Sequence, residues 1–434
     1  MRFSGFQPSE SGRYLFLFDI LPAGFSFGRL KLVLGIVSLS ICMGVTFLSA
    51  AAQSADPATE IKETDPVMHG LCDKSVALLG ESPVHGFGKT LEFKVELVRR
   101  LVDECHYNAL FVESGTYDYI NIQQKLKSGQ DVTDSMISAA IGGLWANKEV
   151  QSLIPFLRER VKSGRLTLGG LDDQIGAGTY ASHQMASNLV QYLQGDDRSR
   201  CLAVLQRHML EQYTGDDPYG PADKAKIVGC LDEIEARISQ PAKSATPWAE
   251  EDRMMIDSLK RSLARNFTED DFTKSDQQVK WGNDRDRSMY LNFRWLLSQL
   301  PSRSKVIVWA ATVHVAKDLS GVSGWDGSVP LGSYIRQDFG DRAFSLGFSA
   351  YSGTYAMVRP PVRQLSAAPE TSLEGQSFAS RNSDTVYLSL EQLRNFGPVA
   401  ARPLGTSFKT ARWDEVLDGL VVFREERAPE YLPR

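Results

Sequence analysis

Four short apolar runs in this chain each lead directly to carboxylate or histidine side chains. The runs and the polar residues after them are 76–80 with Glu81 and His85, 109–112 with Glu113, 166–170 with Asp172, Asp173 and Gln174, and 306–310 with His314. Short apolar runs separated by helical patterns are typical of buried strands in a parallel sheet. Because ligands bind outside the carboxyl ends of such strands, we expect these side chains to meet at one edge of the sheet. Imidazoles and carboxylates gathered there predict an acid–base catalytic site.

The segments between these runs carry helical periodicity. Residues 89–104 place a line of apolar side chains on one helical face. Helical patterns recur at 135–143, 148–162 and 331–339, and further strands are expected at 343–348, 386–388 and 420–423. Alternating strands and helices predict an α/β protein, a three-layer α/β/α fold with a mainly parallel sheet.

The length and composition allow a large core in one or two domains. The chain has 434 residues, of which 42% are hydrophobic and 23% charged, as in ordinary globular proteins. After a polar linker at 53–65, we expect one α/β domain at 66–427. Residues 182–284 form a predicted helical insert, a cap over the strand ends, and a small C-terminal extension completes the domain. A net charge of −5 without a Lys/Arg block argues against nucleic acid as a partner.

The first 55 residues are predicted to be a targeting segment. Arg29 and Lys31 precede an apolar stretch at 32–48, and small residues at 50–52 suit signal cleavage. The stretch from Leu32 to Leu48 is also nearly long enough to anchor the chain in a membrane, so both a cleaved signal peptide and an uncleaved anchor stay open. Either alternative predicts an exported body, periplasmic or secreted.

Four cysteines follow the targeting segment, an even number that suggests disulfides in an oxidising compartment. Cys72 precedes the first strand and Cys105 ends the next helix, so both lie at the same end of a β-α-β unit and could pair. Cys201 and Cys230 then pair by elimination. Four buried free thiols are the alternative.

Three other kinds of site have weak support in the sequence. The segment 86–90 resembles a phosphate-binding loop, but Pro83 stands where that motif requires glycine and offers no N–H to a phosphate. The G-x-S-x-G elbow of serine hydrolases does not occur in residues 66–427, and its single match, at 24–28, lies in the expected targeting segment. His85, His314, Glu81 and Glu113 could bind zinc, although without the usual ligand spacing. Lys94 and Arg285 argue instead that cations balance the carboxylates, so we expect neither a metal nor a cofactor.

Several motifs, in order, resemble the erythromycin esterase family. They are Gly80-Glu81-Ser82-Pro83-Val84-His85-Gly86, Lys94, Glu113, Gly170-Leu171-Asp172-Asp173-Gln174, Arg285-Asp286-Arg287-Ser288-Met289 with Asn292, Val308-Trp309-Ala310-Ala311-Thr312-Val313-His314-Val315, Leu331-Gly332-Ser333-Tyr334-Ile335-Arg336, Phe339-Gly340-Asp341-Arg342 and Trp413-Asp414. The match spans about residues 72–427. The resemblance implies a metal-independent hydrolase that opens lactone or ester bonds of a small molecule with an activated water.

The resemblance also assigns roles to individual residues. His85 corresponds to the proposed general base, Glu81 to the carboxylate that orients it, and Glu113 to a second water-orienting carboxylate. His314 is a further candidate catalytic group. Contacts to substrate are expected from Lys94, Arg285, Asp172 and Gln174, of which the two cations could steady a carboxylate or the developing oxyanion.

Two departures from the family pattern bear on the chemistry. The family usually has one residue fewer between the glutamate and the histidine, so Pro83 or Val84 is an insertion. The fourth strand of the family usually ends in W-A-H-N-x-H, whereas here Ala311 replaces the first histidine and Thr312 the asparagine. Alanine cannot transfer a proton. Two functions therefore stay open: a hydrolase centred on His85, or an altered relative that binds a small molecule or an envelope polysaccharide in the same cleft.

Overall fold

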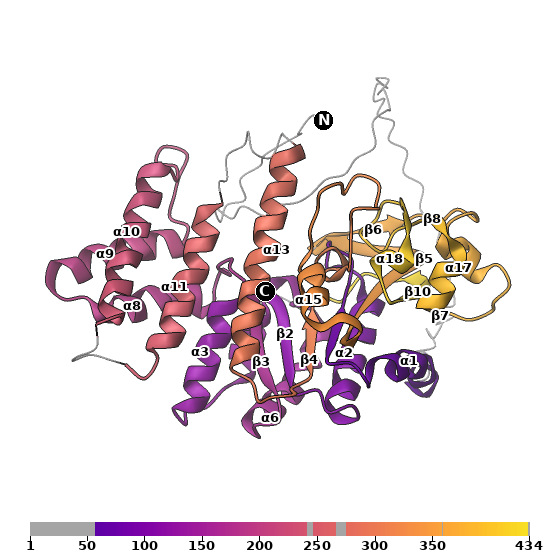
Figure 1. Cartoon of the computed structure of the whole chain (residues 1–434), viewed down its shortest axis with the longest axis horizontal. Coiled ribbons are helices and arrows are strands. Elements are labelled where there is room, and N and C mark those ends of the chain that lie inside the picture. The colour runs from indigo at the N-terminus through magenta and orange to yellow at the C-terminus, as the bar shows by residue number, and fades with distance from the viewer. Residues whose placement is uncertain (1–56, 241–245, 266–274, 358, 433–434) are drawn as a thin grey trace, which may run out of the picture. The chain divides into compact units, whose positions relative to one another are not determined.

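The computed structural model describes residues 57–240, 246–265, 275–357 and 359–432 (Figure 1). The chain divides after Lys62, and residues 63–434 form one compact unit, to which the following description applies. The expected targeting segment, residues 1–55, lies outside the described residues. In the part of the chain that is described, no helix combines the length and the apolar character needed to cross a membrane.

An eight-stranded sheet forms the centre of this unit (Figure 1). Its strands are β1 (Val76–Leu79), β2 (Ala109–Gly115), β3 (Thr167–Asp172), β4 (Val306–Trp309), β5 (Ala343–Met357), β6 (Arg359–Leu365), β7 (Thr385–Ser389) and β10 (Gly419–Glu426). They lie in the order β3-β2-β4-β1-β5-β10-β7, with β6 paired to β5. The pairs from β3 to β10 are parallel, whereas β7 and β6 run antiparallel to their neighbours. The prediction of a mainly parallel α/β sheet is confirmed.

The register of the sheet brings the four predicted strand ends together. Leu79 of β1 pairs with Trp309 of β4, which also pairs with Val112 of β2. Val112 pairs in turn with Gly170 of β3. Parallel strands aligned in this way release the chain at one edge, so the residues that follow them gather there.

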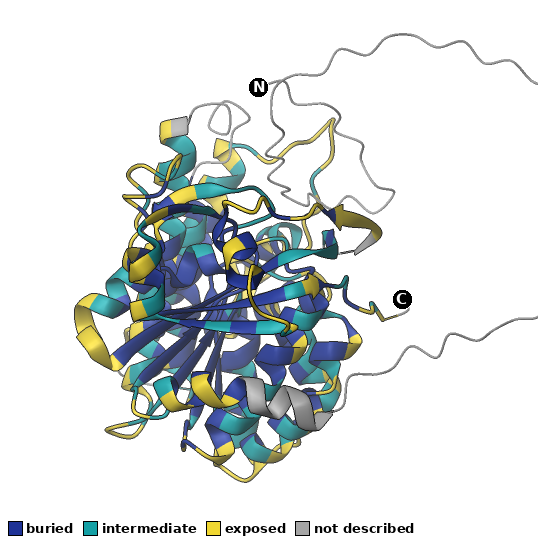
Figure 2. Ribbon diagram, turned by 90° about the vertical axis from the view of Figure 1, so that its right-hand side faces the viewer, coloured by how far each residue is buried: buried dark blue, intermediate teal, exposed yellow. Residues whose placement is uncertain are grey.

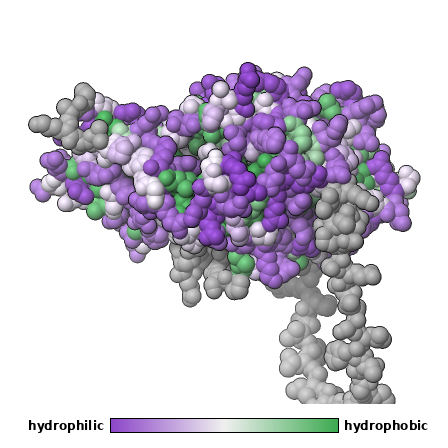
Figure 3. All heavy atoms as spheres, turned by 90° about the horizontal axis from the view of Figure 1, so that it is seen from below, coloured by the Kyte–Doolittle hydropathy of each residue, from purple (hydrophilic) through white to green (hydrophobic). Residues whose placement is uncertain are grey.

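Helices cover both faces of the sheet, because alternate strand residues point to opposite sides. One face, with Leu79 and Leu110, packs against α2 (Gly88–Asp103), α4 (Asp134–Ile141) and α6 (Ile154–Lys162). The other face, with Leu78 and Phe111, packs against α13 (Ser275–Ser298) and α15 (Leu331–Phe339). Figure 2 shows the strands as a buried layer between partly exposed helices. On the face of the molecule in Figure 3, apolar residues are scattered among polar ones.

The predicted helical insert has a hydrophobic core of its own. Its helices are α7 (Tyr180–His183), α8 (Met185–Leu189), α9 (Gly195–Met209), α10 (Pro221–Ile238) and α11 (Ala249–Ala264), and they share this core with α3 (Thr116–Lys127). Helix α13 begins before residue 284, the expected end of the insert, and continues onto the sheet through Met289 and Phe293.

The ends of the domain differ from the sequence-based expectation. Helix α1 (Pro57–Leu71) occupies part of the expected polar linker, and Pro57 suits its first turn because the missing N–H needs no partner there. The C-terminal strands β5, β10 and β7 extend the central sheet itself, with α16 (Leu373–Phe378), α17 (Leu390–Phe396) and α18 (Trp413–Val416) packed beside them. A separate ribbon of β8 (Pro398–Ala401) and β9 (Lys409–Arg412) accompanies them.

Both expected cysteine pairs lie at disulfide distance. The Cα atoms of Cys72 and Cys105 are 5.0 Å apart, at the ends of α1 and α2. Those of Cys201 and Cys230, on α9 and α10, are 5.4 Å apart.

Candidate active site

The carboxylate of Glu81 is the centre of a buried cluster just after β1. It is 1% exposed and accepts hydrogen bonds from His85 Nδ1 at 2.8 Å, Trp145 Nε1 at 2.7 Å and Lys94 Nζ at 3.1 Å. Lys94 Nζ also lies 4.3 Å from the ring centroid of Trp309. Burial alone raises the pKa of Glu81, but the charge of Lys94 and the hydrogen bonds outweigh burial and lower it. Glu81 is therefore an anion at neutral pH, and it fixes the proton of His85 on Nδ1.

His85 is held so that its second nitrogen is available. The described residues offer no hydrogen-bond partner to Nε2, which in this tautomer is an acceptor. The ring packs edge-on against Trp145, with centroids 5.0 Å apart, and the residue is 8% exposed. An imidazole that is held through one nitrogen and leaves the other without a partner has the arrangement of a general base.

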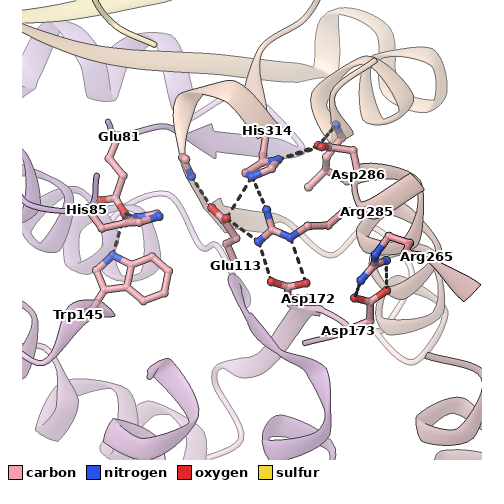
Figure 4. A network of polar contacts seen from close by, with 12 residues as sticks. Glu81, His85, Glu113, Trp145, Asp172, Asp173, Arg265, Arg285, Asp286 and His314 are labelled. Carbon is pink, nitrogen blue, oxygen red and sulfur yellow. Dashed lines mark hydrogen bonds and ion pairs between the residues drawn. The ribbon is translucent and has the colours of Figure 1, made fainter. Parts of the chain in front are cut away.

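A second cluster surrounds the carboxylate of Glu113, which lies near the carboxyl end of β2 (Figure 4). Its Oε1 accepts a hydrogen bond from Arg285 Nη2 at 2.9 Å, and its Oε2 accepts one from the backbone N–H of Ala311 at 2.7 Å. Arg285 also reaches Asp172, through Nη2 at 2.7 Å and Nε at 3.4 Å. Arg285 thus joins α13 to the ends of β2 and β3.

His314 belongs to the second cluster, in contact with three charged residues. Its Nδ1 lies 2.9 Å from Asp286 Oδ1, and its Nε2 lies 3.1 Å from Glu113 Oε1 and 2.8 Å from Arg285 Nη1. Burial alone lowers the pKa of His314, but Asp286 and Glu113 raise it to about 10. His314 is therefore a cation at neutral pH, and with both ring nitrogens in contact with charged partners it is not free to act as a base.

The two clusters face each other across the edge of the sheet. In Figure 4 the ring of His85 extends toward the side on which Glu113 lies. Burial alone raises the pKa of Glu113, but the charge and hydrogen bond of His314 and the charge of Arg285 hold it well below its usual range.

The residues after β3 separate into different environments. Asp172 belongs to the Glu113 cluster, whereas Asp173 forms a two-pronged ion pair with Arg265, in which Nη1 lies 2.6 Å from Oδ2. Gln174 is exposed, and its side chain takes part in neither cluster. The structure thus brings Asp172 into the predicted site and leaves Gln174 outside it.

Two residues of the clusters were not singled out from the sequence. Asp286 follows Arg285 in the resembled motif, so its place beside a site residue was a usable signal. Trp145 had no such signal, because it comes from a short 3₁₀ turn after α4. Among the described residues, no group of three or more His, Cys, Asp or Glu side chains is arranged to hold a metal ion.

Ala311 lies between the clusters and contributes only its backbone to them. It is 1% exposed, and its N–H holds Glu113. The N–H of Thr312 donates to the backbone oxygen of Glu81 at 2.7 Å, while its hydroxyl is buried without a hydrogen-bond partner. The substitutions in this motif keep the backbone contacts and remove a side-chain imidazole.

Comparisons with solved structures support the fold. A Bacillus cereus protein superposes with a TM-score of 0.64 at 16% identity, over 86% of this chain and 94% of that one. A succinoglycan biosynthesis protein gives 0.63 at 12% identity, over 85% and 92%. A mutant of the erythromycin esterase EreC in its open conformation gives 0.57 at 16% identity, over 85% and 94%.

Sequence comparisons identify the family. "Putative hydrolase YbfO" of Bacillus subtilis is 21% identical over 300 residues, which span 64% of this chain and 66% of that protein, just under two thirds of each. A model of the erythromycin esterase family matches residues 102–425, most of the chain. The chain belongs to the erythromycin esterase family.

Proposed function

We propose that this protein hydrolyses an ester or lactone bond of a small molecule with a water activated by His85. The observation that carries the proposal is the pair of Glu81 and His85, in which Nδ1 is held at 2.8 Å and Nε2 has no hydrogen-bond partner among the described residues. A base placed within reach of a water contributes ~10²–10⁴-fold to the rate near neutral pH.

The chemical steps balance with the groups present. A water attacks the carbonyl carbon as its proton passes to Nε2 of His85, and Glu81 stabilises the resulting imidazolium. The C–O bond of the tetrahedral intermediate then breaks, and the same proton passes to the leaving alcohol oxygen. The positive charge of Arg285 beside Glu113 favours the developing oxyanion.

In this scheme His314 does not transfer a proton. Its pKa of about 10 keeps it charged through the pH range in which His85 would act as a base. We assign His314 to holding Glu113 in place, together with Arg285. Glu113, with its pKa well below the usual range, stays an anion and can orient the water through a lone pair.

The test is hydrolysis by the purified protein across a panel of lactones and p-nitrophenyl esters. His85→Gln should lower kcat/KM by ~10²–10⁴-fold, because glutamine cannot accept the proton. The control is His69→Gln, which changes an exposed histidine away from the site. If the wild type turns over none of the panel, yet ligands raise its Tm, the protein is a binder and the proposal is wrong.

We further propose that the protein is exported. Two cysteine pairs at disulfide distance are compatible with an oxidising compartment. Fractionation of cells that express the full chain, with alkylation of free thiols in each fraction, tests this location. Full-length protein found in the cytoplasmic fraction with all five thiols free would contradict it.

A further inference from the structure

The last strand of the sheet caps the helix that follows His85. Glu426, the final residue of β10, is 2% exposed and reaches the start of α2. Its Oε1 accepts the N–H of Lys89 at 2.6 Å, and its Oε2 accepts the N–H and the hydroxyl of Thr90 at 3.2 and 2.8 Å. Helix α2 has no side-chain cap of its own, because Phe87 occupies the N-cap position. Carboxyl oxygens at a helix start satisfy otherwise unpaired N–H groups, although burial raises the pKa of Glu426 to about 7.

The short loop between His85 and α2 is held by the same region. The N–H of Gly88 donates to the backbone oxygen of Arg427 at 2.6 Å, and Gly86 accepts from the N–H of Ala356 at 3.1 Å. A Cβ on Gly86 would lie 1.4 Å from the oxygen of Ala356, so only glycine permits this approach. His85 itself has φ of 50°, in the left-handed region that histidine rarely adopts. Such a conformation persists only where neighbouring contacts fix it.

Beyond Glu426 the chain also holds the segment that carries Trp145. The N–H of Lys148 donates to the backbone oxygen of Glu430 at 2.8 Å, and the N–H of Leu432 donates to that of Ala146 at 3.2 Å. Trp145 is the second hydrogen-bond donor to Oε1 of Glu81, and its ring contacts His85. Residues 426–432 thus contact the supports of His85 from two sides.

From these contacts we propose that Glu426 is a positioning residue for His85, acting through the start of α2. The proposal rests on the proposed function of His85. Without the Glu426 carboxylate, the N–H groups of Lys89 and Thr90 lose their partners, and the loop is free to leave the left-handed conformation at His85. The imidazole then spends less time with Nδ1 on Glu81, which lowers kcat but leaves substrate binding unchanged.

The main variant is Glu426→Gln, which keeps one acceptor oxygen and loses the other. Glu425→Gln is the matched control, since Glu425 is the exposed neighbour on the same strand. Thr90→Val is a second, milder variant that removes only the hydroxyl donor to Oε2.

We expect kcat to fall about 10- to 100-fold in Glu426→Gln, because small displacements of a catalytic group cost this much. KM should stay within a factor of about two, the usual pattern when only a transition-state interaction is lost. Thr90→Val should fall between Glu426→Gln and the control.

Amide hydrogen exchange separates positioning from general stabilisation. Exchange in Glu426→Gln should rise at residues 85–90 and stay unchanged in the sheet. Unchanged kcat, or faster exchange spread over the whole chain, would overturn the proposal. If the wild type hydrolyses nothing, the proposed function fails alone. The NMR signals of the His85 ring then test positioning. Signals that shift in Glu426→Gln but not in Glu425→Gln support it, and signals that shift in neither variant refute it.

Discussion

At the scale of single residues, Ala311 separates this chain from the pattern of its family. The side chain that would carry an imidazole is a methyl group, while the backbone N–H beside it holds Glu113 at 2.7 Å. In the function proposed above, proton transfer is therefore left to His85.

We expect Ala311→His to raise hydrolysis, because it adds an imidazole next to Glu113. The gain should be at least ~10-fold, toward the ~10²–10⁴-fold that a positioned base contributes. Initial rates on the best ester of the panel measure it, and Ala311→Gln controls for side-chain size without a base. Equal rates in the histidine and glutamine variants would contradict the placement of the site.

The charge of His314 predicts how stability depends on pH. Its pKa in the fold, about 10, is above the ordinary value of 6.5. A raised pKa contributes stability that is complete below pH 6.5 and is lost as the pH rises through about 10. Urea unfolding at pH 6.5 and 9.5 should therefore show a smaller advantage of the wild type over His314→Gln at the higher pH. An advantage that is independent of pH would mean that His314 is neutral in the fold.

Residue types and strand ends were enough to predict most of the site from the sequence. Glu81, His85, Glu113, Asp172 and His314 lie in the two clusters because each stands at or just beyond the carboxyl end of a strand of one parallel sheet. What the sequence did not give is the set of hydrogen-bond partners. The charge on His314 depends on Asp286, and the orientation of His85 depends on Trp145. Both Asp286 and Trp145 reach the site only through tertiary packing.

At the scale of elements, α13 is the helix that joins the sheet edge to the second cluster. Two consecutive residues of this helix contact the cluster. Arg285 binds Glu113 and Asp172, and Asp286 binds His314. Asp286 also accepts the N–H of Leu331 at 2.7 Å, at the start of α15. Two helices and three strand ends are thus connected through a few charged side chains.

Arg285→Met should destabilise the fold by about 3–5 kcal/mol, because it leaves buried carboxylates without their cation. The free energy of unfolding in urea measures this loss. Arg287→Met, two positions along the same helix and exposed, is the matched control and should change stability by less than about 0.5 kcal/mol. Equal losses in the two variants would show that the ion pairs of Arg285 do not stabilise the fold.

Helices and strands could be predicted from the sequence where buried positions recur with a clear period. The four apolar runs became β1–β4, and the segment 331–339 became α15. The strand β6 was not expected, because its Pro-rich sequence has no alternation and it pairs only at the edge of β5. The order of the strands also required the structure, since β4 enters between β1 and β2 after the long helical segment.

At the scale of the whole molecule, the two cysteine pairs stabilise different cores. Cys201 and Cys230 join helices within the insert, which has its own hydrophobic core. Cys72 and Cys105 join α1 to α2 beside the sheet, on the core that also contains the helix of Lys94. The insert and the sheet are linked near the site by the ion pair of Asp173 and Arg265.

Removing each pair should therefore affect a different part of the protein. Each bond closes a loop of similar length, with sequence separations of 33 and 29, so Cys→Ser at both positions of either pair should cost about 3–4 kcal/mol. In Cys201→Ser with Cys230→Ser, protease cleavage should begin in the insert while the sheet stays protected. In Cys72→Ser with Cys105→Ser, the loss should reach α2 and lower ester hydrolysis as well. Cleavage that begins at the same place in both double variants would show that insert and sheet unfold as one unit.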